Sequence, residues 1–192
     1  MFMKRLGDFF LDLLEVFVTS FAIFLFIYLL ILQPHKIKGD SMEPNYHDGE
    51  YLLTDKLTYR LKDPARGDVI VFKPPVSQDE EYIKRIIALP GETISIKNGK
   101  YYINGKQLQE NYIPSSIYTN GKSFLPNNTE KSIPPNSYFV SGDNRESSSD
   151  SRYWGFINRE SITGKAWFIY WPIKSMGTIK QGGFNLLGFV SS

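Results

Sequence analysis

A serine in the first quarter of the chain has the surroundings of a nucleophile. Ser41 lies in the sequence KGDSMEP at residues 38–44. The glycine allows the backbone to approach another group closely, and the proline stiffens the chain after the serine. A serine hydroxyl attacks a carbonyl well only when a base removes its proton. The sequence must therefore supply a base elsewhere.

Histidine is the usual base, but the chain has only His35 and His47. His35 adjoins a long apolar segment, and His47 lies in the turn-like sequence NYHDG. Both patterns favour ordinary surface histidines over a Ser-His-Asp site. Without a His-x-x-x-His pair or an Asp-x-Asp loop, the sequence predicts no metal site. The absence of cysteine excludes a disulfide framework, a cysteine zinc site and a cysteine nucleophile.

Lysine is the alternative base, and Lys84 lies in the apolar strand-like sequence YIKRIIA at residues 82–88. The period of two places Lys84 on one face with Tyr82 and Ile86, and Arg85 on the other. A lysine amine is free near neutral pH only if burial lowers its pKa well below about 10.4. Spacing alone favours an ordinary lysine at a sheet edge, so a Ser-Lys pair is here only a hypothesis.

The N-terminal segment that precedes these residues predicts a transmembrane helix. Residues 16–32 contain no charge, and with Leu13 and Leu14 they approach the thickness of a hydrocarbon core, roughly 30 Å. The run is longer than the core of a cleaved signal peptide and ends without a small-x-small site. A buried helix of a soluble protein is the other alternative. We expect residues 1–33 to form an N-terminal end and a single permanent anchor, whose orientation the flanking Lys and Arg residues do not settle.

The rest of the chain predicts one all-β domain over residues 34–175. Apolar runs at 68–72, 82–89 and 166–171 are typical of buried strands, and residues 93–103 alternate around Asn98-Gly99. That dipeptide and Asn104-Gly105 predict hairpin turns. Residues 110–136 are interpreted as a surface insertion, and the tail at 176–192 has no assigned role. The 192 residues carry a net charge of +2, which gives no indication of nucleic-acid binding.

Four segments in order resemble the bacterial type I signal peptidase (leader peptidase) family, whose members are serine proteases with a Ser-Lys dyad. They are GDSMEP at 39–44, RGDVIVF at 66–72, YIKRIIALPGE at 82–92 and GDNRESSSDSRYWG at 142–155. The resemblance implies a transmembrane helix followed by an all-β catalytic domain.

The same resemblance assigns roles to individual residues. Ser41 matches the nucleophile, Lys84 the general base, and Ser148 a serine whose hydroxyl bonds the lysine amine. Asp150 and Arg152 match a charged pair that supports the site. The remaining matches are Asp143 and Arg145 in the same structural segment, Met42 beside the nucleophile as a residue that shapes the binding cleft, and Gly39.

Gly39 occupies a position where some members of the family have a serine that helps to bind the oxyanion. The oxyanion would then rely on the backbone N–H of Ser41, helped by a closely approaching Gly39 backbone. Where such a donor is used, its loss costs about 2 to 4 kcal/mol. This difference concerns the rate and leaves the Ser-Lys dyad in place.

The implied substrates are exported pre-proteins, cut after a small residue, with small side chains at the last and third-last positions of the signal peptide. The implied location is the plasma membrane, crossed once, with the N-terminus in the cytoplasm and the β domain outside. We expect a monomer that needs no cofactor and no metal and binds no nucleic acid.

Two other classes of protein could share these features. A self-cleaving repressor of the SOS type has a Ser-Lys dyad, but a DNA-binding domain would stand where this chain has an apolar span. A membrane-anchored binding module could keep the fold without activity, but it would be expected to lack Ser41 or Lys84, and both are present.

Overall fold

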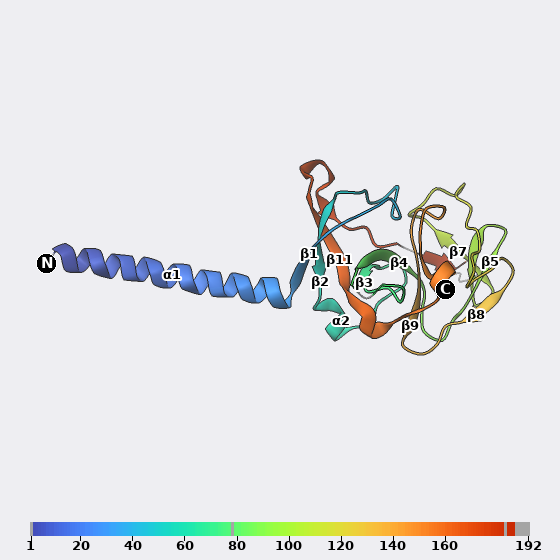
Figure 1. Cartoon of the computed structure of the whole chain (residues 1–192), viewed down its shortest axis with the longest axis horizontal. Coiled ribbons are helices and arrows are strands. Elements are labelled where there is room, and N and C mark those ends of the chain that lie inside the picture. Colours follow the sequence, from blue (N-terminus) through green and yellow to red (C-terminus); the bar gives the residue numbers. More distant parts are fainter. Residues whose placement is uncertain (1, 78, 183, 187–192) are drawn as a thin grey trace, which may run out of the picture.

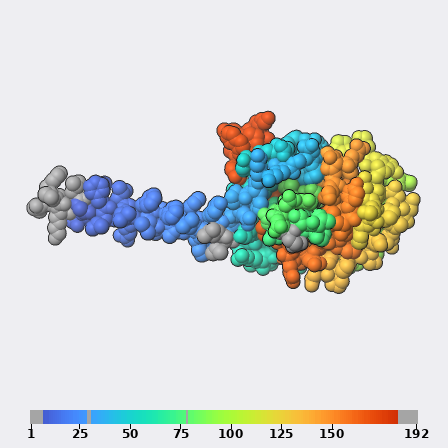
Figure 2. Space-filling view, viewed as in Figure 1, coloured from blue at the N-terminus to red at the C-terminus, as the bar shows by residue number. Residues whose placement is uncertain are grey.

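The computed structural model describes residues 2–77, 79–182 and 184–186, which form a long N-terminal helix and a β domain (Figure 1). Helix α1 (Phe2–Leu30) contains an apolar stretch, Gly7–Tyr28, of 22 residues with mean hydropathy 2.2. None of its most apolar window is buried, and Figure 2 shows α1 projecting clear of the domain. This confirms the predicted N-terminal apolar helix, which is long and apolar enough to cross a membrane.

The helix ends before the predicted anchor does, because the chain enters a sheet at Leu32. Strand β1 (Leu32–Lys36) pairs antiparallel with β2 (Tyr51–Asp55). The backbone N–H of Lys56, just after β2, donates to the carbonyl of Ile31 at 2.9 Å. The residue that follows α1 is thus hydrogen-bonded to the domain, and the domain begins two residues earlier than the expected boundary.

The domain consists of antiparallel strands in two sheets, as the all-β prediction requires. The larger has the order β1-β2-β11-β3-β4-β9-β10, with β12 also paired to β11. Its further members are β3 (Val69–Phe72), β4 (Tyr82–Ala88), β9 (Ser137–Ser141), β10 (Ile157–Asn158), β11 (Ile162–Trp171) and β12 (Gly177–Thr178). Short helices α2 (Thr58–Leu61) and α3 (Ser151–Trp154) and the 3-10 turns η1 (Arg159–Ser161) and η2 (Ile173–Ser175) connect them.

The smaller sheet has the order β13-β7-β6-β5-β8 and contains both predicted hairpins. Its strands are β5 (Thr93–Lys97), β6 (Lys100–Ile103), β7 (Lys106–Glu110), β8 (Glu130–Ser132) and β13 (Phe184–Leu186). Asn98-Gly99 joins β5 to β6 and Asn104-Gly105 joins β6 to β7, and all four residues have positive φ. This is the backbone geometry that two-residue hairpin turns need.

The predicted buried strands β3 and β4 occupy the middle of the larger sheet. Every residue of β3 is buried, as are the last five of β4. In β11, by contrast, Ala166 is buried but Trp167 and Trp171 are about half exposed, at 47% and 53%. The prediction of a fully buried strand there is wrong, because β11 presents only one of its faces to the core.

The segment interpreted as a surface insertion is in part a core segment. No helix or strand is assigned between β7 and β8, which agrees with its weak strand signals. However, Leu125 and Ile133 are buried in one hydrophobic cluster with Ile94, Tyr101 and Phe139. The surface interpretation is therefore wrong for these two residues, since they pack in the core against residues of the smaller sheet.

The C-terminal tail also belongs to the domain, as far as it lies within the described residues. β12 pairs with β11, and β13 pairs with β7. The carbonyl of Lys180 accepts from Arg85 at 3.3 Å, and the side chain of Gln181 accepts from the N–H of Val69 at 2.7 Å. Residues 187–192, the end of the unassigned tail, lie outside the described residues.

Candidate active site

Ser41 and Lys84 lie in direct contact, which joins two segments 43 positions apart in the sequence. The amine Nζ of Lys84 donates to the hydroxyl Oγ of Ser41 at 2.7 Å and to the carbonyl of Ile83 at 3.0 Å. Ser41 is in a turn that follows β1, and the fully buried side chain of Met42 fixes this turn to the core. A nucleophile and a base within hydrogen-bond distance are the minimum that nucleophilic catalysis requires.

Lys84 lies on the predicted strand and on the predicted face of it. Its Nζ is 5.4 Å from the centre of the Tyr82 ring, so these two side chains share one face. Lys84 is only 4% exposed, and burial lowers its pKa to about 8, although the charges of Asp150 and Asp143 act to raise it. With this pKa, about one amine in ten is neutral at pH 7 and can accept a proton.

Arg85 points to the opposite face, where it pairs with Asp143. Its Nε and a terminal nitrogen donate to the two carboxylate oxygens at 2.8 and 2.7 Å, and both side chains are fully buried. Asp143 also accepts from the side-chain amide of Asn45 at 2.8 Å. Asn45 is four residues after Ser41, so this network ties the turn that carries the serine to the strand that carries the lysine.

Asp150 and Arg152 form the predicted charged pair, also fully buried. Nε and a terminal nitrogen of Arg152 donate to the carboxylate of Asp150 at 2.8 Å each. Burial acts to raise the pKa of Asp150, but the hydrogen bonds and charge of Arg152 outweigh it and hold that pKa below its usual range. Asp150 also accepts from the N–H of Gly142 and the hydroxyl of Ser141, both at 3.0 Å.

Gly142 allows the segment after β9 to approach the serine turn. A Cβ at this position would lie 2.3 Å from the carbonyl oxygen of Ser41 and 2.3 Å from Oγ of Ser148. The N–H of Asn144 donates to that same Ser41 carbonyl at 3.1 Å. Gly142 was part of a matching segment but was not singled out from the sequence, because its role depends on this distant contact.

Ser148 lies beside this contact, but its hydroxyl does not make the bond that the resemblance implied. Its Oγ is buried and makes no hydrogen bond of ordinary geometry with the described residues, but it lies close enough to the carboxylate of Asp150 to help lower the pKa of that group. The structure therefore brings Ser148 to the site, against Gly142, without a hydrogen bond to Lys84.

Arg145 lies farther along the same segment and is bound to residues that sequence reasoning missed. It forms an ion pair with Glu110, in which one nitrogen donates to Oε2 at 3.0 Å, and donates to the hydroxyls of Tyr112 and Thr119 at 2.9 and 2.8 Å. Glu110 and Tyr112 lie at the start of the supposed surface insertion, so no local signal marked them as partners of a buried arginine.

A cleft of about 500 Å³ opens at the Ser41–Lys84 pair. It is lined by residues 35–38 and Ser41, by residues 79–84, and by Leu52, Val71 and Ser149. Met42 is not among the described residues that line it, since its side chain is buried behind the wall. In Figure 2 the green segment before β4 lies on the visible face of the domain.

Gly39 and His35 differ from their expected environments, whereas His47 does not. Gly39 has φ +79°, and its N–H donates to the carboxylate of Asp48 at 2.7 Å, so this N–H is already engaged. The side chain of His35 is 15% exposed and lies in the cleft wall, so its interpretation as a surface residue is wrong. The side chain of His47 is 56% exposed, as a surface residue should be.

The described residues contain no group of three or more His, Cys, Asp or Glu side chains arranged to hold a metal ion. The polar groups of the site are instead a hydroxyl, a buried amine and the ion pairs that surround them. Such a site can supply a nucleophile and a proton acceptor to a carbonyl substrate.

Comparison with known proteins identifies the family. Residues 10–171 match the family described as signal peptidase, peptidase S26. The match covers most of the chain, including α1 from residue 10, the serine turn, β4 and the segment after β9. The chain belongs to this family of peptidases.

Two relatives agree with this assignment, and one solved structure is also similar. The chain is 36% identical over 177 residues to "Probable signal peptidase I-2" of Synechocystis sp., covering 88% of this chain and 77% of that protein. It is 35% identical over 175 residues to "Signal peptidase IB" of Staphylococcus aureus, covering 84% of this chain and 91% of that protein. A crystal structure of a signal peptidase I from Enterococcus faecalis V583 matches with 31% identity and a TM-score of 0.44, over 54% of this chain and 97% of that one.

Proposed function

We propose that this protein is a membrane-anchored serine endopeptidase that removes signal peptides from exported pre-proteins, with Ser41 as nucleophile and Lys84 as general base. The contact of 2.7 Å between the serine hydroxyl and a buried lysine amine is the observation that carries this proposal. Family membership supports the class of peptidase, and the names of the relatives support the substrate class.

In the proposed reaction the neutral amine of Lys84 takes the proton of Ser41 as Oγ attacks the scissile carbonyl. The resulting ammonium protonates the leaving amine, which breaks the peptide bond and leaves an acyl ester on Ser41. Water then attacks the ester while Lys84 accepts its proton; the bond to Ser41 Oγ breaks, the ammonium returns the proton to Oγ, and the product leaves with a new carboxyl end. The lowered pKa of Lys84, about 8, keeps enough of the amine neutral for the first step.

The oxyanion would be held by the backbone N–H of Ser41. Gly39 cannot supply a side-chain donor, and its own N–H is bound to Asp48. We propose that the hydroxyl of Ser148, which lies against Gly142 at the site, accepts from the Lys84 amine and helps to orient it. The Asp150–Arg152 and Asp143–Arg85 pairs are assigned to positioning, because they fix the segments on either side of the dyad.

The same proposal places α1 across the plasma membrane, with the β domain on the extracytoplasmic side and the protein as a monomer. β1 starts directly after α1, and Ser41 comes five residues after the end of β1. The nucleophile would thus be held near the membrane surface, where the end of a signal peptide emerges.

The test is cleavage of a purified pre-protein with an Ala-x-Ala site by the full chain in detergent. Wild type is compared with Ser41→Ala and Lys84→Met, and circular dichroism shows whether each variant is folded. We expect cleavage after the second alanine by wild type alone. Activity of either folded variant would contradict the role of the substituted residue, and no cleavage by folded wild type would favour a binding module.

A further inference from the structure

Gln181 lies outside the proposed dyad, but its side-chain amide is bound within the larger sheet. Its Oε1 accepts from the backbone N–H of Val69, the first residue of β3, at 2.7 Å. Its Nε2 donates to the backbone carbonyl of Ala166, in β11, at 3.1 Å, and to that of Ile179 at 3.3 Å. One amide thus bonds a donor on one strand and an acceptor on the next, as a peptide group does in a sheet.

The amide lies where the pairing of β3 with β11 stops. The two strands pair through three positions, and the last of them is Ile70 with Lys165. Beyond Lys165, β11 continues to pair with β2 on its other side. Val69 and Ala166 are the next residues of the two strands, and both are fully buried. Because a buried backbone N–H or carbonyl without a partner is costly, the amide supplies hydrogen bonds that the ladder lacks at this point.

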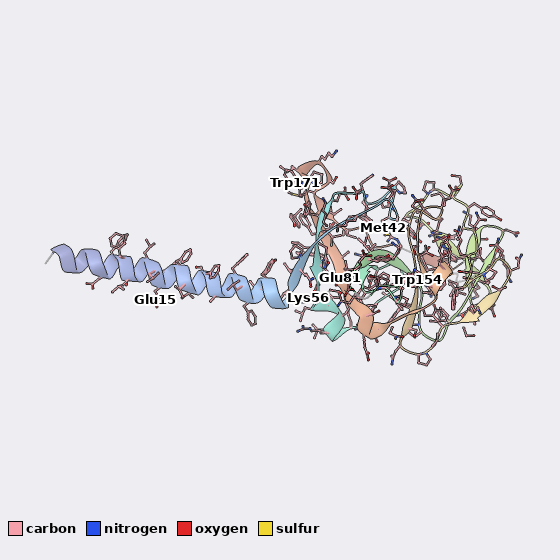
Figure 3. The ribbon with its side chains drawn as sticks, in the orientation of Figure 1. Glu15, Met42, Lys56, Glu81, Trp154 and Trp171 are labelled. Atoms are coloured by element: carbon pink, nitrogen blue, oxygen red, sulfur yellow. The ribbon has the colours of Figure 1, made fainter. Side chains whose placement is uncertain are left out.

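Val69 connects this point to both members of the dyad. In the β3–β4 pair, the residue after Val69 lies opposite Lys84. The side chain of Val69 packs in one hydrophobic cluster with Met42, the neighbour of Ser41. Figure 3 shows Met42 within the domain, away from α1. A change in the position of Val69 would therefore reach both the amine and the turn that carries the hydroxyl.

The main chain on either side of Gln181 is held to the domain independently of its side chain. The carbonyl of Lys180 accepts from the hydroxyl of Tyr46 at 3.1 Å. The N–H of Gly182 donates to the carbonyl of Gly67, just before β3, at 3.0 Å. Both bonds use backbone groups of this segment, so a substitution of Gln181 removes the amide without removing them.

We propose that Gln181 is a positioning residue, whose side-chain amide takes the place of a missing backbone hydrogen bond between β3 and β11 and thereby keeps Ser41 and Lys84 in contact. This inference rests on the proposed function and assigns to it a residue that acts through β3. Without the amide, water has to satisfy the N–H of Val69 and the carbonyl of Ala166, and it then enters the sheet beside the strand of Lys84. The burial that lowers the pKa of Lys84 decreases, so this pKa rises from about 8 towards 10.5.

The test measures kcat, KM and the pH dependence of the rate for the full chain in detergent, with an Ala-x-Ala pre-protein as substrate. Gln181→Met keeps the length of the side chain without the amide. At pH 8 we expect its kcat to be about tenfold lower with KM unchanged, because fewer Lys84 amines are neutral and a small displacement of the reacting groups slows the reaction. The midpoint of its pH–rate profile should rise from near pH 8 to about pH 9. Gln181→Asn keeps an amide that is one methylene shorter, so its midpoint should lie between those of wild type and Gln181→Met.

Gln109→Met is the matched control, because Gln109 is also half-buried but lies in β7 of the smaller sheet. It should leave kcat and the midpoint unchanged. A purely structural role of Gln181 would reduce the amount of folded enzyme without moving the midpoint. An unchanged midpoint in folded Gln181→Met would therefore overturn the inference.

If Gln181→Met does not fold, the midpoint of Gln181→Asn decides in the same way. Loss of fold in both variants would also overturn the inference, since the amide would then be needed for the fold as a whole. Failure of the proposed function is distinguishable, because wild type would then leave the pre-protein uncut.

Discussion

Burial of Lys84 should lower the free energy of unfolding of the protein. Lys84→Met should restore part of that free energy. The pKa of Lys84 is about 8 in the folded protein and 10.5 without the protein environment. Between these pH values the unfolded chain binds more protons than the folded one, so the free energy of unfolding of wild type rises with pH across this window. Below pH 8 the burial of the charged amine lowers the free energy of unfolding by its full amount. This amount is about 3 kcal/mol, because each pKa unit corresponds to about 1.4 kcal/mol.

Methionine fills a similar volume without a charge, so Lys84→Met avoids this cost at pH 7. It also loses the hydrogen bond to Ser41, which is worth about 1 kcal/mol. We therefore expect a free energy of unfolding about 2 kcal/mol higher than wild type at pH 7, and no gain at pH 10.5 and above. The measurement is urea unfolding of the full chain in detergent, followed by tryptophan fluorescence over this pH range.

Lys62→Met is the matched control, because Lys62 is exposed at the end of α2. It should show no such pH-dependent gain. The reasoning would be refuted if Lys84→Met were less stable than wild type at pH 7, or if its advantage did not change with pH.

Three further predictions concern the rate, the close contact at the site and the core. The initial rate of cleavage by wild type should rise about tenfold from pH 7 to pH 9, with a midpoint near pH 8, as Lys84 loses its proton. An initial rate that does not change over this range would exclude a lysine base with this pKa. Gly142→Ala should lower kcat/KM by about 10²-fold, because its Cβ must displace the carbonyl of Ser41; wild-type kinetics would show that the turn adapts. Leu125→Ala should lower the free energy of unfolding by about 2 to 5 kcal/mol, because Leu125 is fully buried. Leu61 is 79% exposed, so Leu61→Ala should change this free energy by less than about 0.5 kcal/mol. Equal effects of the two substitutions in urea unfolding would mean that residues 110–136 contribute nothing to the core.

Features set by local pattern could be predicted from the sequence. The uncharged run predicted the apolar helix, and the two Asn-Gly dipeptides predicted the hairpins, because each depends on neighbouring residues alone. The alternation in β4 placed Lys84 and Arg85 on opposite faces, as the structure has them.

Features set by distant contacts could not be predicted in this way. The burial of Leu125, the pairing of β13 with β7 and the partners of Arg145 all depend on segments that meet only in the folded domain. The sequence pattern indicates a surface position for His35, because it does not show that Glu81, 46 positions away, is its partner. The matching segment predicts that Ser148 lies near Ser41, and it lies against Gly142 there. The hydrogen bonds of its hydroxyl depend on side-chain geometry, which a sequence motif does not specify.

The contacts of residues 180–182 make the strands of the site dependent on a segment that lies about a hundred positions away in the sequence. Lys180 supplies an acceptor to Arg85, next to the proposed base, and Gln181 supplies one to Val69, the first residue of β3. The N–H of Gly182 donates to the carbonyl of Gly67, just before β3, at 3.0 Å. The hydrogen bonding around the proposed base is therefore complete only when this late segment has folded back against β3 and β4.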